Sequence, residues 1–175
     1  MDESSERQQA ENVDRDAFVE AMRQVAATVT VVTTQAGDGP AGATVSAFTS
    51  LSADPPSVLV CLRADSRISR AVGESGLFCV NVLPEHASDL ALRFAGAFDA
   101  DRPDRFEGLD LRETPYGPIL PQSLVFTCRL ERQITHGSHA ICIGGVTGIT
   151  QSGAKPLAYM HGDFHVVRPH GENGD

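Results

Sequence analysis

The chain has 175 residues, 41% of them apolar and 21% charged, which is enough for one domain with a sizeable core. Its formal net charge of −9 argues against nucleic acid and anionic membrane surfaces as partners, although a local nest of N–H groups can still bind an anion. No apolar run approaches the roughly 20 residues that span a bilayer, and the acidic start MDESSERQQAENVDRD is unlike a signal peptide, so we expect a cytoplasmic protein.

We expect a single domain over residues 14–168, between polar tails at 1–13 and 169–175 that should be disordered. The domain begins with a helix, DRDAFVEAMRQVAA, for which Asp14 is a plausible N-cap. Phe18, Met22 and Val25 recur at spacings of four and three and should share one face. The domain therefore starts with an amphipathic helix.

The β-branched segment TVTVVTT predicts a strand, and it is followed by a literal G-x-G-x-x-G at Gly37, Gly39 and Gly42. A dinucleotide-binding fingerprint needs a helix that opens at its last glycine. Here the glycines are followed by ATVSAFTSLSA, which is β-branched, rich in serine and ended by DPP. The motif therefore argues against a Rossmann fold and predicts a hairpin turn whose glycines supply positive φ.

The segment ATVSAFTSLSA predicts one alternating strand that lies in the core and carries many hydroxyls. Hydroxyls and N–H groups crowded at a strand end suit a phosphate or a polar heterocycle, but they equally suit an edge that faces solvent. On the residues alone both interpretations stay open. The hydroxyl-bearing residues are Thr44, Ser46, Thr49, Ser50 and Ser52.

Short apolar runs separated by turn signals continue to the end of the chain. They favour a mainly β, antiparallel barrel over a doubly wound parallel sheet. The expected elements are a strand at 56–63, a helix at 64–76 capped by Asp65 or Ser66, a strand at 77–83, a helix at 85–98, an irregular segment at 99–123, and strands at 124–136, 139–150 and 157–167.

Cysteine and histidine spacings do not predict a metal site. No C-x-x-C occurs, and all four cysteines sit in apolar runs where a free thiol behaves as a small hydrophobe, so we expect buried thiols. His161 and His165 are spaced for a helical zinc site but lie in a strand-like segment without the glutamate, and His136 and His139 form H-x-x-H in a loop.

Seven segments carry a family resemblance by their joint order and spacing: VTVVTT, GATVSAFTSLSADPPSVLVCL, DSRISRAVGESGLFCVNVL, LALRFA, DRFEGL, SHAICIGGV and PLAYMHGDF. From about Phe18 to Val167 the chain resembles the flavin reductase-like, FMN-binding split β-barrel family. This family includes the small reductase components of two-component flavin-dependent monooxygenases. The resemblance implies a Greek-key split barrel that forms a homodimer and binds FMN or FAD near the dimer interface.

The resemblance also assigns flavin-binding roles to matched positions. Ser66 and Arg67 would bind the flavin phosphate, and ADSRIS is independently a good anion site because a helix N-terminus, a hydroxyl and a guanidinium coincide there. Phe94 would approach the flavin from the second inserted helix, and Arg105 and Phe106 would help to cover its nucleotide end. The residues that would line the isoalloxazine ring are Thr44, Val45, Ser46 and Ser50, continued by Cys61, Leu62 and Arg63.

For the nicotinamide the resemblance implies a histidine, His139, as the residue closest to the reaction. The family usually has Gly-Asp-His where this chain has Gly137-Ser138-His139, so no acid is available to fix the imidazole tautomer. The segment that would line the nicotinamide site is Tyr159, His161, Gly162, Asp163 and Phe164. His161 replaces an arginine common in the family, which favours NADH over NADPH.

Together these features predict an NAD(P)H:flavin oxidoreductase that transfers a hydride from the nicotinamide to the flavin and supplies reduced flavin to a partner monooxygenase. Two alternatives stay open. One is a flavin-binding carrier or sensor without turnover, against which the nicotinamide segment and His139 argue. The other is a one-component flavoprotein that acts on its own substrate and would hold its flavin tightly.

Overall fold

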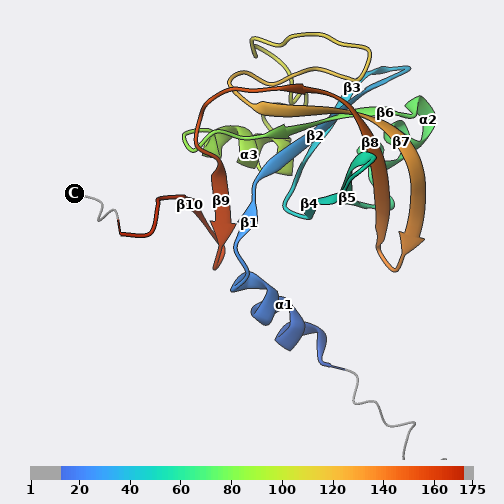
Figure 1. Cartoon of the computed structure of the whole chain (residues 1–175). Coiled ribbons are helices and arrows are strands. Elements are labelled where there is room, and N and C mark those ends of the chain that lie inside the picture. The colour runs from blue at the N-terminus through green and yellow to red at the C-terminus, as the bar shows by residue number, and fades with distance from the viewer. Residues whose placement is uncertain (1–12, 172–175) are drawn as a thin grey trace, which may run out of the picture.

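The computed structural model describes residues 13–171, which contain ten antiparallel strands and three helices (Figure 1). The predicted tails at 1–13 and 169–175 fall largely outside these residues. The larger sheet has the order β3-β2-β6-β7-β8-β5-β4 and the smaller sheet the order β1-β9-β10. The strands are β1 (Ala27–Thr28), β2 (Thr30–Ala36), β3 (Gly39–Val45), β4 (Phe48–Ala53), β5 (Pro56–Arg63), β6 (Leu77–Val82), β7 (Leu124–His136), β8 (His139–Thr150), β9 (Leu157–Met160) and β10 (Asp163–Val166).

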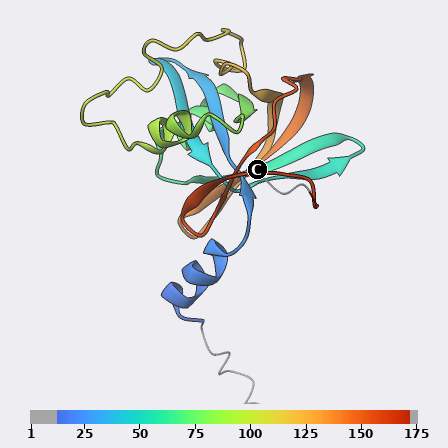
Figure 2. The ribbon, with the colours of Figure 1, turned by 90° about the vertical axis from the view of Figure 1, so that its left-hand side faces the viewer.

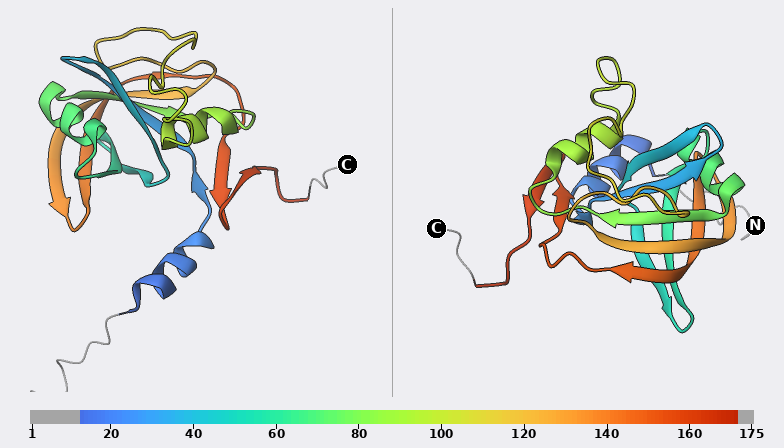
Figure 3. Two further views of the ribbon diagram at one scale, coloured as in Figure 1. Left: turned by 180° about the vertical axis from the view of Figure 1, so that it is seen from behind. Right: turned by 90° about the horizontal axis from the view of Figure 1, so that it is seen from above.

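The larger sheet curves into a barrel that does not close, because β3 and β4 remain at its two edges (Figure 3). Every neighbouring pair in it is antiparallel. The two sheets and their open barrel confirm the mainly β, split-barrel fold that the sequence predicted.

The helices are α1 (Arg15–Arg23), α2 (Arg67–Ser75) and α3 (Ser88–Ala95). The side chain of Asp14 caps α1 by accepting hydrogen bonds from the backbone N–H groups of Asp16 and Ala17, as predicted. Ser66 rather than Asp65 is the N-cap of α2, which ends at Gly76 in the left-handed region (φ 66°). None of the three is long and apolar enough to cross a membrane.

Two apolar clusters form the core. The first lies between the curved sheet and α2 and includes Val60, Phe78 and Val80. The second lies under α3 and includes Phe94, whose ring meets that of Phe106 edge-on with centroids 5.0 Å apart. These clusters fix α2 and α3 against opposite parts of the same hairpin, β2–β3.

The predicted strand at 43–53 is wrong in two respects. The chain breaks at Ser46–Ala47, and the residues before and after the break belong to strands at opposite edges of the sheet. Thr49, Ser50 and Ser52 are exposed on edge strand β4 instead of lying in the core. The alternation of side chains along the sequence does not reveal this break, because the residues before and after it keep the same two-residue periodicity.

The glycine motif forms the predicted β2–β3 hairpin, with Ala36 opposite Gly39. However, only Gly39 of the three glycines has positive φ (112°), so that expectation is wrong for Gly37 and Gly42. A Cβ at Gly42 would lie 2.8 Å from Phe94 Cε1 and 2.9 Å from Phe106 Cζ. Gly42 is therefore needed for the close packing of two aromatic rings on the strand.

The closing segment 157–167 is a hairpin of two strands rather than one strand. His161 and Gly162 both have positive φ, 55° and 85°, as the central residues of a type I′ turn require. The backbone N–H of His161 donates to the carbonyl of Arg23, which attaches this turn to the end of α1. In the sequence, the dipeptide His161-Gly162 is the feature that indicates this turn between β9 and β10.

Helix α1 projects away from the two sheets, beside the β9–β10 hairpin (Figures 1 and 2). It has no buried residue, and Phe18 and Met22 of its apolar face are 58% and 50% exposed. The sequence predicted an amphipathic helix, but within this chain its apolar face packs against no core.

At one edge of the larger sheet, arginine side chains donate hydrogen bonds to backbone carbonyls of strand β3. Arg67 Nη1 donates to the Pro40 carbonyl over 2.8 Å, and Arg105 Nη1 donates to that of Gly42 over 3.3 Å. At the other edge, the pairing of β4 with β5 shifts register between Ser50 and Ser52. The edges therefore differ, one being covered by side chains and the other interrupted by a bulge.

Candidate functional site

A cavity of about 350 Å³, the strand-end cavity, opens where β3 turns into β4, beside the end of β5 and the start of α2. It brings together predicted residues from β3 and its break to β4, the end of β5, the start of α2, α3, the irregular segment after α3 and the start of β8. Its lining residues are Ala43, Thr44, Val45, Ser46, Ala47, Cys61, Leu62, Arg63, Ser66, Ile68, Phe94, Ala95, Arg105 and His139.

A second cavity of about 340 Å³, the loop cavity, adjoins it under the irregular segment 99–106. The two cavities share Ala43, Ser66, Ile68 and Arg105. The other residues of the loop cavity are Pro40, Ala41, Gly42, Arg67, Asp99, Pro103, Asp104 and Phe106. Arg67, a predicted phosphate ligand, thus lies on the loop-cavity side of Ser66.

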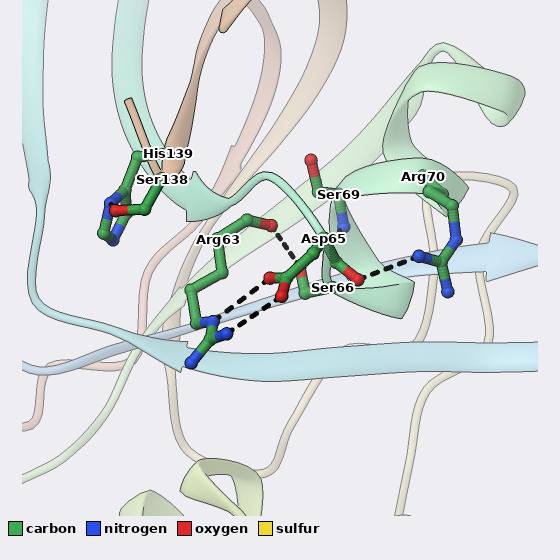
Figure 4. Close-up of polar contacts among 7 residues, drawn as sticks. All are labelled: Arg63, Asp65, Ser66, Ser69, Arg70, Ser138 and His139. Atoms are coloured by element: carbon green, nitrogen blue, oxygen red, sulfur yellow. Dashed lines mark hydrogen bonds and ion pairs between the residues drawn. The ribbon is translucent and has the colours of Figure 1, made fainter. Parts of the chain in front are cut away.

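The N-terminus of α2 stands at the boundary of the two cavities. The Ser66 hydroxyl donates to the Arg63 carbonyl over 2.6 Å and accepts from the Ser69 N–H over 3.2 Å (Figure 4). This capping geometry fixes the first turn, whose outward N–H groups and dipole favour an anion. The structure thus presents an anion-binding end between two cavities.

The arginines around this helix end are already paired. Arg63 Nε and Nη2 donate to the two carboxylate oxygens of Asp65 over 3.2 and 3.0 Å, and this pairing holds the pKa of Asp65 below its ordinary value (Figure 4). Arg67 Nη2 donates to Asp38 over 2.8 Å and likewise lowers the pKa of that carboxyl. Both ion pairs are exposed, so their guanidinium groups can exchange partners at small cost.

His139 lies at the cavity rim, at the start of β8, with its Cα opposite that of Arg63 on β5. Its Nδ1 is 2.9 Å from the hydroxyl of Ser138 (Figure 4). The Ser138 carbonyl accepts a hydrogen bond from the Ala64 N–H. The Ser138 hydroxyl therefore contacts the imidazole from the position at which the sequence analysis noted the missing acid.

Two residues of the strand-end cavity have features that the sequence did not predict. The Thr44 hydroxyl donates to the Ala91 carbonyl over 2.6 Å, so it holds α3 in place. Cys61 is only half-buried and faces the cavity, which contradicts the expectation of four buried thiols. Cys79, Cys128 and Cys142 are free and buried as expected, and burial raises their pKa values to about 11, 12 and 11.

Six predicted residues line neither the strand-end cavity nor the loop cavity. Ser50 is exposed on β4, and the other five, Tyr159, His161, Gly162, Asp163 and Phe164, lie on the β9–β10 hairpin of the smaller sheet. The rings of Tyr159 and Phe164 meet edge-on, 5.5 Å between centroids. Within one chain the expected flavin and nicotinamide residues are therefore only partly assembled.

Tyr159 lines a third, mostly apolar hollow of about 670 Å³, the α1 groove. The groove runs between α1 and β4, and it shares Ser46 and Ala47 with the strand-end cavity. The remaining lining residues are Phe18, Val19, Met22, Arg23, Val25, Ala26, Ala27, Thr28, Phe48, Thr49 and Leu59.

The loop over the second cavity is held by two arginines whose part the sequence did not reveal. Arg105 donates to both carboxylate oxygens of Asp99 and to the Phe94 carbonyl over 2.5 to 2.8 Å. Arg93, 7% exposed, donates to the Glu107 carbonyl over 2.5 Å, while its Nε has no partner among the described residues. No periodic signal marks these residues, since they act through carbonyls of an irregular segment.

Comparisons with known proteins agree with this geometry. The model of the family described as "Flavin reductase like domain" matches residues 22–168. The chain is 34% identical to the reductase subunit HsaB of a flavin-dependent monooxygenase from Mycobacterium tuberculosis, over 90% of this chain and 84% of the relative. It is 36% identical to the FMN reductase (NADH) RutF 2 of Methylorubrum extorquens, over 93% of this chain and 96% of the relative.

Among solved structures, the NADH:FAD oxidoreductase SgcE6 of Streptomyces globisporus, in complex with NAD and FAD fragments, superposes with a TM-score of 0.81. It is 28% identical to this chain, with 93% of this chain and all of the other covered. The likeness extends over the two cavities and the β9–β10 hairpin, since the matched span includes all of them.

Proposed function

This chain belongs to the flavin reductase-like domain family, and we propose that it transfers a hydride from NADH to a flavin seated in the strand-end cavity. The observation that carries the proposal is the meeting of Ser46, Cys61 and Ser66 with His139 around that one cavity. These residues come from four separate segments, so their meeting is a property of the fold and not of any motif.

The cavity fits the isoalloxazine half of a flavin. Val45, Leu62 and Phe94 form an apolar wall of the cavity. The backbone at the β3–β4 break would offer hydrogen-bonding groups to the polar edge of the isoalloxazine ring. The capped N-terminus of α2 lies at one end of the cavity, where the flavin phosphate would bind. When bound, the flavin supplies the hydride-accepting atom and carries the redox chemistry.

The protein groups then bind, orient and exclude water. Ser66 and the first-turn N–H groups of α2 would hold the phosphate, while the hydride step needs no acid or base from the protein. His139 would contact the nicotinamide at the rim, with Ser138 fixing its ring through Nδ1. That interaction leaves Nε2 to face the ligand, so we assign His139 an orienting part.

We propose that the enzyme works as a homodimer. The apolar face of α1 and the α1 groove are exposed in one chain, and Ser46 and Ala47 join this groove to the strand-end cavity. A second copy that covers the groove would bring further residues to the rim of the cavity. The predicted nicotinamide residues Tyr159 to Phe164 are candidates for this contribution.

We further propose that reduced flavin passes to a separate monooxygenase in the cytoplasm. The similarity to the reductase subunit HsaB supports this partner. The cavity opens to the surface, which suits a flavin that enters and leaves.

The test is steady-state oxidation of NADH, followed at 340 nm, with FMN or FAD added in turn. We expect turnover that saturates with added flavin. His139→Ala should raise the KM for NADH more than the Kd for flavin, whereas His136→Ala, in the same β7–β8 turn but outside the cavity, should leave both unchanged.

Two results would contradict the proposal. A tightly bound flavin that neither NADH nor NADPH reduces would replace the reductase with a flavin carrier. Equal effects of the two histidine substitutions would remove His139 from the nicotinamide site.

A further inference from the structure

We infer that the loop cavity is the site of the adenosine 5′-phosphate half of FAD, so that this chain is built for the dinucleotide flavin rather than for FMN alone. The inference rests on the proposed function, because it takes the strand-end cavity as the place of the isoalloxazine ring. The relatives' names include both an FMN reductase and an NADH:FAD oxidoreductase, so family membership does not decide the flavin.

The sizes of the two cavities match the two halves of FAD. FMN and adenosine 5′-phosphate are of broadly similar size, and the cavities measure about 350 and 340 Å³. They are continuous through four shared residues, including Ser66 and Arg105. FMN would fill the first cavity and end at Ser66, leaving the second without a ligand group.

The junction between the cavities suits a pyrophosphate. The N-terminus of α2 faces this junction, and Arg67 lies just beyond it on the loop-cavity side. A single phosphate can use the helix end alone, whereas a second phosphate would continue toward the Arg67 guanidinium. That guanidinium is now held by Asp38 and the Pro40 carbonyl in an exposed ion pair, from which it can turn.

The walls of the loop cavity suit a purine. Pro40, Pro103 and Phe106 present flat or apolar surface, and Phe106 is 9% exposed because it packs on Phe94. Gly42 lets these two rings meet at the wall between the cavities. A base that stacks on this wall would lie on the other side of the same aromatic pair from the isoalloxazine ring.

The acidic residues of the loop cavity do not repel a phosphate strongly. The Asp99 carboxylate is neutralised by Arg105, and this pairing lowers the pKa of Asp99. Asp104 accepts the Phe106 N–H over 2.8 Å. Its remaining acceptor capacity is available to an exocyclic amine or a ribose hydroxyl.

Hydrogen bonds hold the loop over the cavity in one arrangement, and a preformed cavity lowers the entropy cost of binding. Arg105 ties the loop to carbonyls of α3 and β3, and Arg93 ties it to the carbonyl of Glu107. NADH carries the same adenosine 5′-phosphate group, so the experiment must separate the two sources.

The experiment measures the Kd of FAD and of FMN by quenching of flavin fluorescence, without NADH, on the full chain. Pro103→Trp fills the loop cavity, and Asp101→Trp places the same side chain on the exposed, non-lining part of the loop. We expect wild type to bind FAD more tightly than FMN. Pro103→Trp should remove this preference by raising the Kd of FAD roughly tenfold, with a much smaller change for FMN. Asp101→Trp should keep the preference.

Two outcomes overturn the inference. Equal affinities for FAD and FMN in wild type would mean that the loop cavity adds nothing. An unchanged preference in Pro103→Trp would remove the adenosine of FAD from this cavity, and a separate turnover assay with FMN as acceptor would then assign the cavity to the nicotinamide nucleotide if the variant raises the KM for NADH. Because binding is measured without turnover, failure of NADH oxidation would affect the proposed function alone.

Discussion

The strand-end cavity and the α1–β9–β10 region differ in how completely one chain builds them. The cavity is enclosed by residues that contacts within the chain hold in place. The Ser66 hydroxyl donates to the Arg63 carbonyl, the Thr44 hydroxyl donates to the Ala91 carbonyl, and the ring of Phe94 packs on that of Phe106. In contrast, α1 has no buried residue, and Tyr159 is 37% exposed.

The difference indicates which half of the proposed site can form from contacts within one chain. The flavin half of the proposed site should form in an isolated chain, because its geometry depends on contacts within that chain. The nicotinamide half should depend on a second copy that covers the α1 groove. The substitutions below act on one region at a time.

The largest expected effect comes from Phe94→Ala. Phe94 is 1% exposed, and loss of its ring from the core should lower the free energy of unfolding by about 3–5 kcal/mol. Phe98→Ala, at a residue that is 41% exposed, should cost less than about 1 kcal/mol. Urea unfolding measures both, and similar losses would show that the wall between the cavities is not part of the core.

The next effect concerns the double variant Phe18→Asp/Met22→Asp on α1. It should separate the proposed dimer into monomers and lower kcat/KM for NADH roughly tenfold or more, equivalent to about 1.4 kcal/mol. Flavin affinity should change little, since these residues do not line the strand-end cavity. Glu20→Gln on the same exposed helix is the control.

Analytical ultracentrifugation and flavin titration check this prediction. If the charged variant remains a dimer, or if it loses flavin and NADH affinity equally, the two regions are not separable as described.

Ser66 tests the cap and the phosphate site separately. Ser66→Ala should cost about 1 kcal/mol of stability because it removes the α2 cap, whereas Ser66→Gly should cost only a few tenths. Both remove the hydroxyl and should weaken flavin binding several-fold. Flavin affinity that falls in proportion to stability would reduce Ser66 to a structural cap.

The smallest effect is the reactivity of Cys61. Burial raises the pKa of this thiol above its ordinary value, so at pH 8 it should react with a thiol reagent more slowly than a free cysteine. The rate should rise about tenfold per pH unit while the pH stays below that pKa, because the thiolate is the reactive form.

Bound flavin should protect Cys61 from the reagent, in the α1 double variant as well as in wild type, and Cys61→Ser should abolish this labelling. Protection that depends on an intact α1 would show that the flavin half also needs the second copy.

Local signals predicted much of this fold. β-branched runs gave the strands, Asp14 and Ser66 gave two helix starts, and the glycine motif gave a hairpin. Two features escaped, namely the break at Ser46–Ala47 and the turn at His161–Gly162. Both change the direction of the chain without a change in residue periodicity, which is why periodicity alone joined the strands.

The sequence indicated a residue's local part where a motif marks it, as ADSRIS does for the helix cap Ser66. It did not indicate the contacts by which a residue acts on the backbone of a distant segment. Arg93 and Arg105 shape the loop cavity by binding carbonyls, and carbonyls have no sequence signature. Likewise, the ion pair that fastens Arg67 joins it to Asp38, far along the chain.

The two sheet edges have a consequence for colloidal behaviour. An open barrel offers rows of backbone groups on which further chains can add as strands and grow into fibrils. Here arginine side chains occupy carbonyls along β3, and the bulge between Ser50 and Ser52 interrupts the ladder of β4. Association through sheet edges should therefore stop at small closed assemblies, and the protein should tolerate high concentration without polymerising.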